Sequence, residues 1–287
     1  MSAQRAATLA PMMWPALGFV FLMVVFPFGF AFWLSLHDHK IGQIVQFIGI
    51  DNFVQIWHDN LFWNGLRLTL QLYGLSLVLQ LVLGVALGLL LNRVQRLRNL
   101  VRTVMVSPFM LPPVVIGMMA IVVLDPGMGV VNHLLKVANL PTSLFLASTD
   151  GVIYTIVLID TWQWTPFVAL IVLGGLQALP QRIHDAAAID GARGWRELFY
   201  ITLPMLGPTI LTAAVLRSVD LLRFFDVIYI TTQGGPGYAS TTLNIYAYKK
   251  AFDFADVGYA SALMITLSSI VFAAVLVFSQ FRKKVSW

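Results

Sequence analysis

The sequence predicts an all-helical integral membrane protein with six spans. Of its 287 residues, 59% are hydrophobic and only 11% are charged, whereas a soluble domain carries about a quarter charged residues. The mean hydropathy is +0.81. Long uncharged stretches recur along the chain, and each can supply the ~20 apolar residues that a helix needs to cross a bilayer. The chain contains no cysteine, so disulfides and thiol metal sites are excluded.

The spans follow in order along the chain. Residues 6–36 carry no charge, which is too long for the apolar region of a signal peptide, so we expect a retained first span. Arg67 and Arg93 bracket the second span, and Asp160 lies within the fourth. The expected spans are residues 12–36, 68–92, 103–124, 151–179, 203–231 and 257–281, in a single transmembrane domain over residues 1–287.

The distribution of basic residues predicts the orientation. An even number of spans places both termini on one side, and the side richer in Lys and Arg is cytoplasmic. Cytoplasmic termini put most of the 18 Lys and Arg residues inside. The inner residues are Arg5, Arg93, Arg96, Arg98, Arg102, Arg182, Arg193, Arg196, Arg282, Lys283 and Lys284, against Lys40, Lys136, Lys249 and Lys250 outside. This asymmetry explains the net charge of +5 without nucleic acid, and makes the loop at 181–203 cytoplasmic.

That loop belongs to the one long polar, small-residue segment between two apolar spans, QRIHDAAAIDGARGWRELFYITLP at 181–204. Its run of alanines at 186–188 lets a short helix lie close to another protein. Asp190 and Gly191 interrupt this helix, because Asp caps a following helix and Gly adopts backbone conformations closed to other residues. We expect a short helix, a bend and a second short helix. Pro204 suits the first turn of the next span.

Part of this segment, DAAAIDGARGWRELFYITLP, resembles the EAA loop of binding-protein-dependent ABC importer permeases, with the approximate pattern EAAxxDGAxxxxxFxxIxLP. The residues in register are Asp185, Ala186, Ala187, Asp190, Gly191, Ala192, Ile201, Leu203 and Pro204. Asp185 replaces the leading Glu, and Leu198 replaces the usual Phe. In that family the loop is the coupling helix, which sits in a groove of the ATPase subunit. The resemblance implies this role for Asp185, Ala186, Ala187, Asp190, Gly191, Ala192, Trp195 and Leu198. The alternative is an amphipathic linker that binds nothing.

The resemblance covers nearly the whole chain. FIGIDNFVQIW at 47–57 is similar to the family's GLdNY stretch, and Phe225-Asp226 followed by TTQGGP is similar to its FD...lTgGGP stretch. Taken alone, Gly-Gly-Pro predicts a turn and Asp51-Asn52 predicts a helix cap. Together the stretches resemble the compact sugar-type permeases. That resemblance implies the type I importer (MetI-like) fold, a second homologous permease, two ATPase subunits and an extracytoplasmic solute-binding protein, in a bacterial cytoplasmic membrane.

The sequence argues against an enzyme. It has no GxxxxGK[ST] run, so any ATP and Mg²⁺ would bind to partner ATPase subunits, and we expect no cofactor in this chain. The histidines offer no metal-binding spacing, and no nucleophile and base pair is recognisable. An integral membrane enzyme would need such a constellation.

Polar residues at membrane depth are candidates for a solute path, because a charge inside a span costs at least ~2.5 kcal/mol and normally faces the bundle interior or water. Arg217, Asp220, Arg223 and Asp226 repeat every three residues with alternating sign. They either line the outer half of a path or form a self-neutralised ladder that anchors span five. The candidate path residues are Gln80, Asp160, Trp162, Gln163, Trp164, Asp220 and Arg223. Gly84 and Gly88 predict a helix-packing face.

These observations predict a permease subunit of an ATP-driven ABC importer for a sugar or polyol. The alternatives are an ion-gradient-driven secondary transporter, which should show an inverted repeat and discontinuous helices, and an exporter or channel component without a binding protein. A phosphorylated solute would favour several unpaired Arg or Lys residues in the path. The alternating ladder pairs most of these charges, so we expect a neutral sugar or polyol.

Overall fold

The computed structural model describes residues 3–94 and 98–285, so Arg96, one of the inner basic residues, lies outside the described part. The chain forms two compact units. The first contains the chain up to Phe62 together with Ala247–Ser268, and the second contains Trp63–Tyr246 together with the chain from Ser269 onward. Each unit is described by itself, and a single permease domain over residues 1–287 stays a prediction.

The expected all-helical membrane architecture is confirmed. Within the described residues, five helical stretches are long and apolar enough to cross a membrane, and one bent helix pair makes a sixth. The five are Met13–Ser35 in α1 (Ala3–Ser35), α3 (Asn60–Arg93), α7 (Val152–Ala178), Trp195–Thr231 and Val257–Phe278 in α13 (Val257–Val285). The sixth candidate is the pair Asn99–Met110 and Pro113–Val123.

This third span is broken where the sequence analysis expected one continuous helix at 103–124. Its halves, α4 (Arg98–Met110) and α5 (Pro113–Val123), are bent by 92°. The cause is the Pro112-Pro113 pair, since a proline disfavours helical geometry at the residue before it and has no N–H to donate.

The fifth span is also interrupted. α10 (Leu203–Leu222) ends before Phe224, and a separate helix, α11 (Asp226–Thr231), packs against α5. Gly117 permits this close approach, because a Cβ there would lie 2.9 Å from the Ile230 side chain. Burial of Ile116 and Val227 in one apolar cluster compensates for the break.

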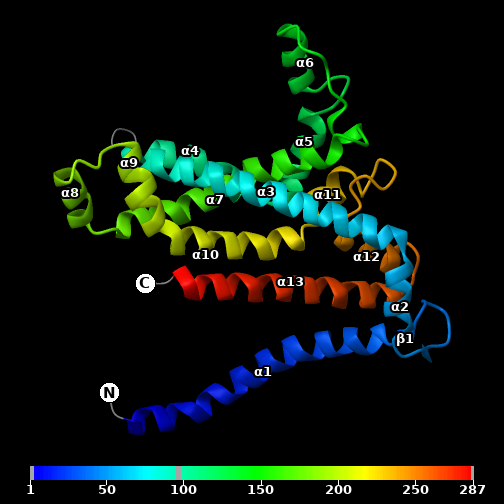
Figure 1. The fold of residues 1–287 in the computed structure, drawn as a ribbon. Coiled ribbons are helices and arrows are strands. Elements are labelled where there is room, and N and C mark those ends of the chain that lie inside the picture. The colour runs from blue at the N-terminus through cyan, green and yellow to red at the C-terminus, as the bar shows by residue number, and fades with distance from the viewer. Residues whose placement is uncertain (1–2, 95–97, 286–287) are drawn as a thin grey trace. The chain divides into compact units, whose positions relative to one another are not determined.

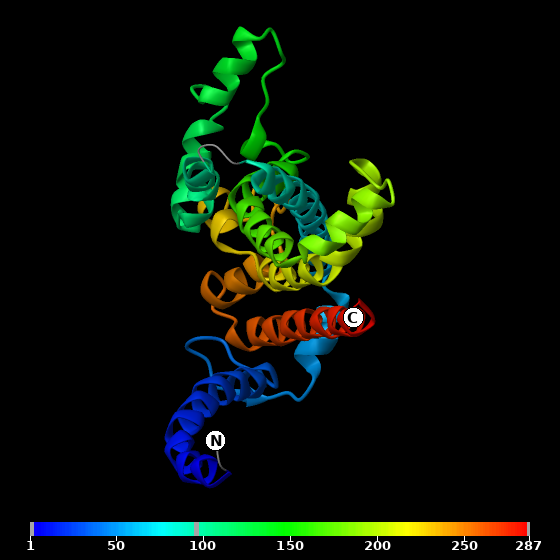
Figure 2. The same cartoon turned by 90° about the vertical axis from the view of Figure 1, so that its left-hand side faces the viewer.

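Three long helices of the second unit, α3, α7 and α10, lie side by side (Figures 1 and 2). Val168 and Val172 of α7 are fully buried between α3 and α10. The two glycines of α3 allow this contact, since a Cβ would come within 2.5 Å of Val168 at Gly84 and 2.8 Å of Val172 at Gly88. The predicted packing face is confirmed.

The segment between α5 and α7 forms α6 (Val130–Val137) and a short 3-10 helix, η1 (Phe145–Ala147). α6 projects away from the α3, α7 and α10 helices of its unit (Figure 1). Buried Asn132 holds this projecting segment together. Its side-chain amide donates to the Ser143 carbonyl at 2.9 Å and accepts from the Ser143 N–H at 3.0 Å. The predicted Gly-Gly-Pro turn precedes α12 (Leu243–Phe252), with Gly234 at a φ of +90°.

In the first unit, α1 leads into an antiparallel hairpin of β1 (His37–Asp38) and β2 (Gln46–Phe47), followed by α2 (Asp51–His58). The predicted cap at Asp51-Asn52 is not formed, because α2 begins at Asp51 and has no side-chain cap. Instead, the buried Asn52 amide donates to the carbonyls of Ser35 at 2.9 Å and His37 at 3.1 Å. This side chain therefore ties the start of α2 to the end of α1.

Candidate functional site

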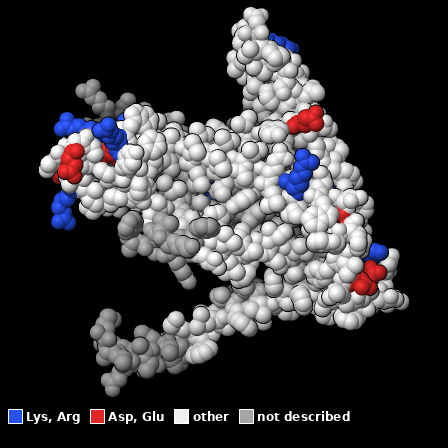
Figure 3. Space-filling view, viewed as in Figure 1, with Lys and Arg blue, Asp and Glu red and all other residues white. Residues whose placement is uncertain are grey.

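The loop that resembles a coupling helix folds as the sequence predicted, with a short helix, a bend and a second short helix. The elements are α8 (Gln181–Ile189), α9 (Trp195–Glu197) and a π-helical turn, η2 (Leu198–Thr202), which continues into α10. Pro204 lies in the first turn of α10, as expected. α8 extends away from α7 and α10 (Figure 1), and the charged side chains of this loop gather at one end of the unit (Figure 3).

The Asp-Gly-Ala sequence ends α8. Gly191 has a φ of +76°, and its N–H donates to the Ala188 carbonyl at 3.4 Å. The N–H of Ala192 reaches back to the Ala187 carbonyl at 2.8 Å. This pair of bonds is the Schellman ending, in which a glycine supplies the left-handed residue just after the helix. Asp190 is the C-cap of α8, which corrects the expectation that it caps the following helix.

The predicted coupling residues divide between exposed and buried positions. Asp185, Ala186, Asp190 and Trp195 are exposed, whereas Ala187 is buried and Ala192 and Leu198 are partly buried. The Trp195 ring is 75% exposed and stacks on Phe199 at 5.8 Å. The exposed side of the loop therefore carries small, acidic and aromatic side chains, whereas Ala187, Ala192 and Leu198 are more shielded from solvent.

A second feature of the loop escaped the sequence analysis. Nδ1 of His184 in α8 lies 2.7 Å from Oε1 of Glu197 in α9. Neither residue belongs to the recognised pattern, and they stand 13 positions apart. Their pairing depends on the angle between α8 and α9, which the predicted bend did not specify.

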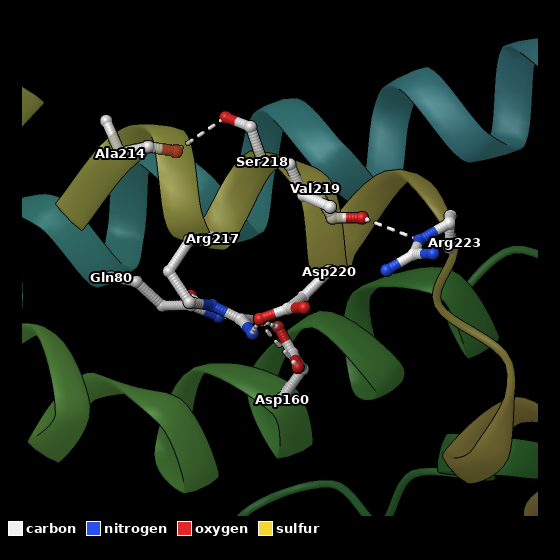
Figure 4. A network of polar contacts seen from close by, with 8 residues as sticks. All are labelled: Gln80, Asp160, Ala214, Arg217, Ser218, Val219, Asp220 and Arg223. Carbon is white, nitrogen blue, oxygen red and sulfur yellow. Dashed lines mark hydrogen bonds and ion pairs between the residues drawn. The ribbon is translucent and has the colours of Figure 1, made fainter. Parts of the chain in front are cut away.

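Three of the candidate path residues, Gln80, Asp160 and Asp220, meet at one buried cation, Arg217 of α10 (Figure 4). Its side chain is 1% exposed. Nε donates to Oε1 of Gln80 at 2.7 Å, and Nη2 donates to both carboxylate oxygens of Asp160, at 3.2 and 3.1 Å. The Gln80 amide completes the triangle by donating to Asp160 at 2.5 Å. The cluster thus joins α3, α7 and α10 through charge-assisted hydrogen bonds.

The alternating ladder of α10 is only partly formed. Nη1 of Arg217 lies 3.4 Å from Asp220, whose side chain is 46% exposed. Arg223 is exposed, and its Nε donates to the carbonyl of Val219, away from the cluster (Figure 4). Asp226 begins α11 beyond the break in the span. The main partner of Arg217 is therefore Asp160 on another helix, and not the next residue of the ladder.

The aromatic and amide candidates of α7 point in different directions. Trp164 lies under Arg217, with its ring centre 4.1 Å from the guanidinium carbon, in a cation–π contact. Trp162 is 51% exposed and lines an apolar groove with Ile116 of α5. The buried Gln163 amide donates to the carbonyl of Leu111 at 3.2 Å, at the α4–α5 bend. A helix broken inside a membrane needs such a donor for its freed backbone.

The structure therefore brings Gln80, Asp160, Trp164 and Asp220 together and leaves Trp162, Gln163 and Arg223 outside the cluster. The sequence contained one unused signal for this arrangement. Asp160 is the single acidic residue of its span, and a carboxylate there requires a cation. Which cation it meets depends on long-range packing. A direct contact between any of these residues and solute stays a prediction.

Residues 80–285 match the family described as binding-protein-dependent transport system inner membrane component. The chain belongs to this family. It is 31% identical over 268 residues to the trehalose/maltose transport system permease protein MalF of Thermococcus litoralis, covering 93% of this chain and 90% of that protein. It is 32% identical over 266 residues to the trehalose transport system permease protein SugA of Mycobacterium tuberculosis, covering 92% and 85%.

Solved structures share the fold of this inner membrane component. A chain of a bacterial ABC transporter involved in the import of the acidic polysaccharide alginate has a TM-score of 0.85 at 24% identity, covering 99% of this chain and 98% of that one. A chain of the MetNI methionine ABC transporter has a TM-score of 0.61 at 16% identity, covering 82% and 99%. The protein is a multi-pass permease with the MetI-like fold, and the secondary-transporter alternative is set aside.

Proposed function

We propose that this permease is a transmembrane subunit of an ATP-driven ABC importer that carries a sugar or polyol. The observation that carries the proposal is the coupling loop, in which a glycine-ended α8 extends from the bundle with Asp185 and Ala186 exposed. Because α9, η2 and α10 follow one another without a break, movement of the loop that includes α9 would reach the spans. ATP binding on partner subunits would then switch the permease between inward and outward access.

The partners follow from the same proposal. The loop would dock on one of two ATPase subunits, which would bind ATP and Mg²⁺ and hydrolyse the nucleotide. The solute would pass along the interface with a second homologous permease, after delivery by an extracytoplasmic binding protein. One solved alginate transporter is in complex with an alginate pentasaccharide-bound periplasmic protein, which supports delivery by a binding protein. Both termini would be cytoplasmic.

The choice of solute class rests on two observations. Relatives of the chain include permeases named for trehalose/maltose, for trehalose and for sn-glycerol-3-phosphate. In this chain the polar cluster offers no free cation to a phosphate group, because the buried Arg217 is neutralised by Asp160 and the exposed Arg223 lies outside the cluster. We therefore favour a neutral sugar or polyol, with the half-exposed Asp220 as the acidic group of the cluster best placed to accept a hydroxyl hydrogen bond.

A pull-down of the tagged chain from detergent-solubilised native membrane tests the proposal. We expect an ATPase subunit and a second permease to co-purify. The binding protein from the same system can then be titrated with neutral sugars, polyols and sugar phosphates by calorimetry. Recovery of the chain alone, still active in gradient-driven uptake by vesicles, would contradict the proposal. Tight binding of a sugar phosphate only would contradict the choice of solute class.

A further inference from the structure

The two short helices of the coupling loop are joined by a backbone that can turn easily. Between α8 and α9 lie two glycines at positive φ, Gly191 at +76° and Gly194 at +64°. Among the described residues, nothing stands within 4 Å of the position where a Cβ would project from either one. A short segment with two glycines can serve as a hinge, since few residues need to change to absorb a rotation. A hinge at this place would let α8 move without α10.

One side-chain contact spans that hinge. Nδ1 of His184 lies 2.7 Å from Oε1 of Glu197, and both side chains are about two-thirds or more shielded from solvent. The other side-chain hydrogen bond at α8 in the described part of the chain, from Gln181 to Asp185, stays within that helix. The His184–Glu197 pair is therefore the side-chain strut that fixes the angle between α8 and α9.

We propose that His184 and Glu197 are positioning residues of the coupling step. Glu197 is followed directly by η2 and α10, and α10 carries Arg217. A displacement of α8 that keeps the strut intact would move the base of α10 with it, and through Arg217 would act on Asp160 and Gln80. With the strut broken, the glycine hinge absorbs part of the displacement. This inference rests on the proposed function of the loop.

The test measures coupling, not folding. The full complex is reconstituted into proteoliposomes with its binding protein, and ATP hydrolysis and solute uptake are measured on the same sample. His184→Ala and Glu197→Ala should leave ATPase co-purification intact and lower the solute carried per ATP about twofold to fivefold, as expected for a partly shielded pair. The double variant should lose no more than either single variant, because all three remove the same contact.

Two matched variants complete the design. His184→Gln keeps an N–H that can reach the Glu197 carboxylate, and it should restore most of the ratio. Arg93→Ala removes an exposed basic side chain at the end of α3, outside the coupling loop, that makes no ion pair within the described residues, and it should leave the ratio unchanged. An unchanged ratio in both alanine variants would overturn the proposal, as would an equal drop in Arg93→Ala.

A cross-link gives a second, independent measurement. The chain has no cysteine, so His184→Cys with Glu197→Cys can be bridged by a short bifunctional thiol reagent. Before bridging, the double cysteine variant should carry less solute per ATP than the parent chain, and bridging should raise this ratio toward the parent value. A bridged protein that stays uncoupled would contradict the proposed role of the His184–Glu197 contact. If the parent chain recovers no ATPase at all, the proposed function itself fails, which is a different outcome from a normal complex with an insensitive ratio.

Discussion

At the scale of single residues, Arg217 shows how a buried charge is compensated by its neighbours. Its guanidinium meets acceptors from Gln80, Asp160 and Asp220, and the Trp164 ring covers one face. Breaking a buried pair from one side leaves an uncompensated charge, whereas replacing both partners with apolar groups of similar volume can be nearly neutral. The stability of this cluster therefore depends on its members being present together.

The first prediction concerns Asp160. Asp160→Ala should destabilise the protein by about 3–5 kcal/mol, because Arg217 loses its main buried partner. Asp220→Ala should cost less than about 1 kcal/mol, since Asp220 is half exposed and its contact is longer. Thermal unfolding in detergent, followed by size-exclusion chromatography, compares the two. The double variant Asp160→Leu with Arg217→Met should recover much of the loss. Equal effects of the two single substitutions would contradict the central role of Asp160.

The second prediction concerns Gly191. A non-glycine residue in left-handed geometry costs about 1–2 kcal/mol, and a β-branched residue is among the least tolerant. In the part of the chain that the structure describes, no atom stands within 4 Å of the missing Cβ, so the cost is backbone strain and not a clash. Gly191→Val should open the end of α8 and reduce uptake by roughly 5- to 30-fold, while membrane insertion is retained. Gly191→Asn is the matched control, because asparagine tolerates this conformation. Similar uptake by the two variants would rule out strain as the cause.

At the scale of helices, the α3–α7 contact predicts that alanine substitution at two glycines of α3 affects stability differently. Gly84→Ala places a methyl group within 2.5 Å of Val168, and such overpacking costs about 1–3 kcal/mol. Gly74→Ala meets nothing within 4 Å, so the helix propensity of alanine should leave stability unchanged or raise it by up to about 1 kcal/mol. Thermal unfolding of both variants in detergent checks the pair. A loss at Gly74 as large as at Gly84 would mean that close packing is not the cause.

Helices were predictable from sequence where hydrophobicity alone decides them, and their interruptions were not. The α4–α5 bend did have a signal in Pro112-Pro113, which the continuous run of apolar residues concealed. The break between α10 and α11 has no glycine or proline at residues 223–225. It depends on the packing of α11 against α5, a contact between segments more than 100 residues apart that no local pattern encodes.

At the scale of the whole molecule, the orientation can be tested with the cysteine-free sequence as background. Thr149→Cys, in the segment between α5 and α7, should react with a membrane-impermeant maleimide on intact cells. Arg193→Cys, in the coupling loop, should react only after permeabilisation, because the basic segments are predicted to be cytoplasmic. Both positions are exposed in the structure. The reverse pattern of labelling would invert the proposed topology.

In the candidate site, as in the fold, features set by local sequence were predictable and features set by long-range packing were not. The coupling loop was identifiable because Asp190, Gly191 and Ala192 form a contiguous pattern whose backbone geometry is local. The polar cluster was recognised only as separate candidates. Gln80, Asp160 and Arg217 lie in three different spans, so their pairing is a property of the packed bundle, and helical rotation also separates Trp162 from Trp164. The sequence therefore predicted the local loop motif, but not which residues of different spans contact one another.

The Asp160–Arg217 pair also has a consequence for how the protein is made. Arg217 follows Asp160 by 57 residues. At a synthesis rate of ~5–20 residues per second, Arg217 is therefore made about 3–11 s after Asp160. During that time a carboxylate in the centre of a span costs about 2.5–3.5 kcal/mol, and Gln80, already synthesised, supplies only a neutral amide. We expect α7 to remain at the translocon until α10 emerges, so that both helices are released into lipid as one hairpin.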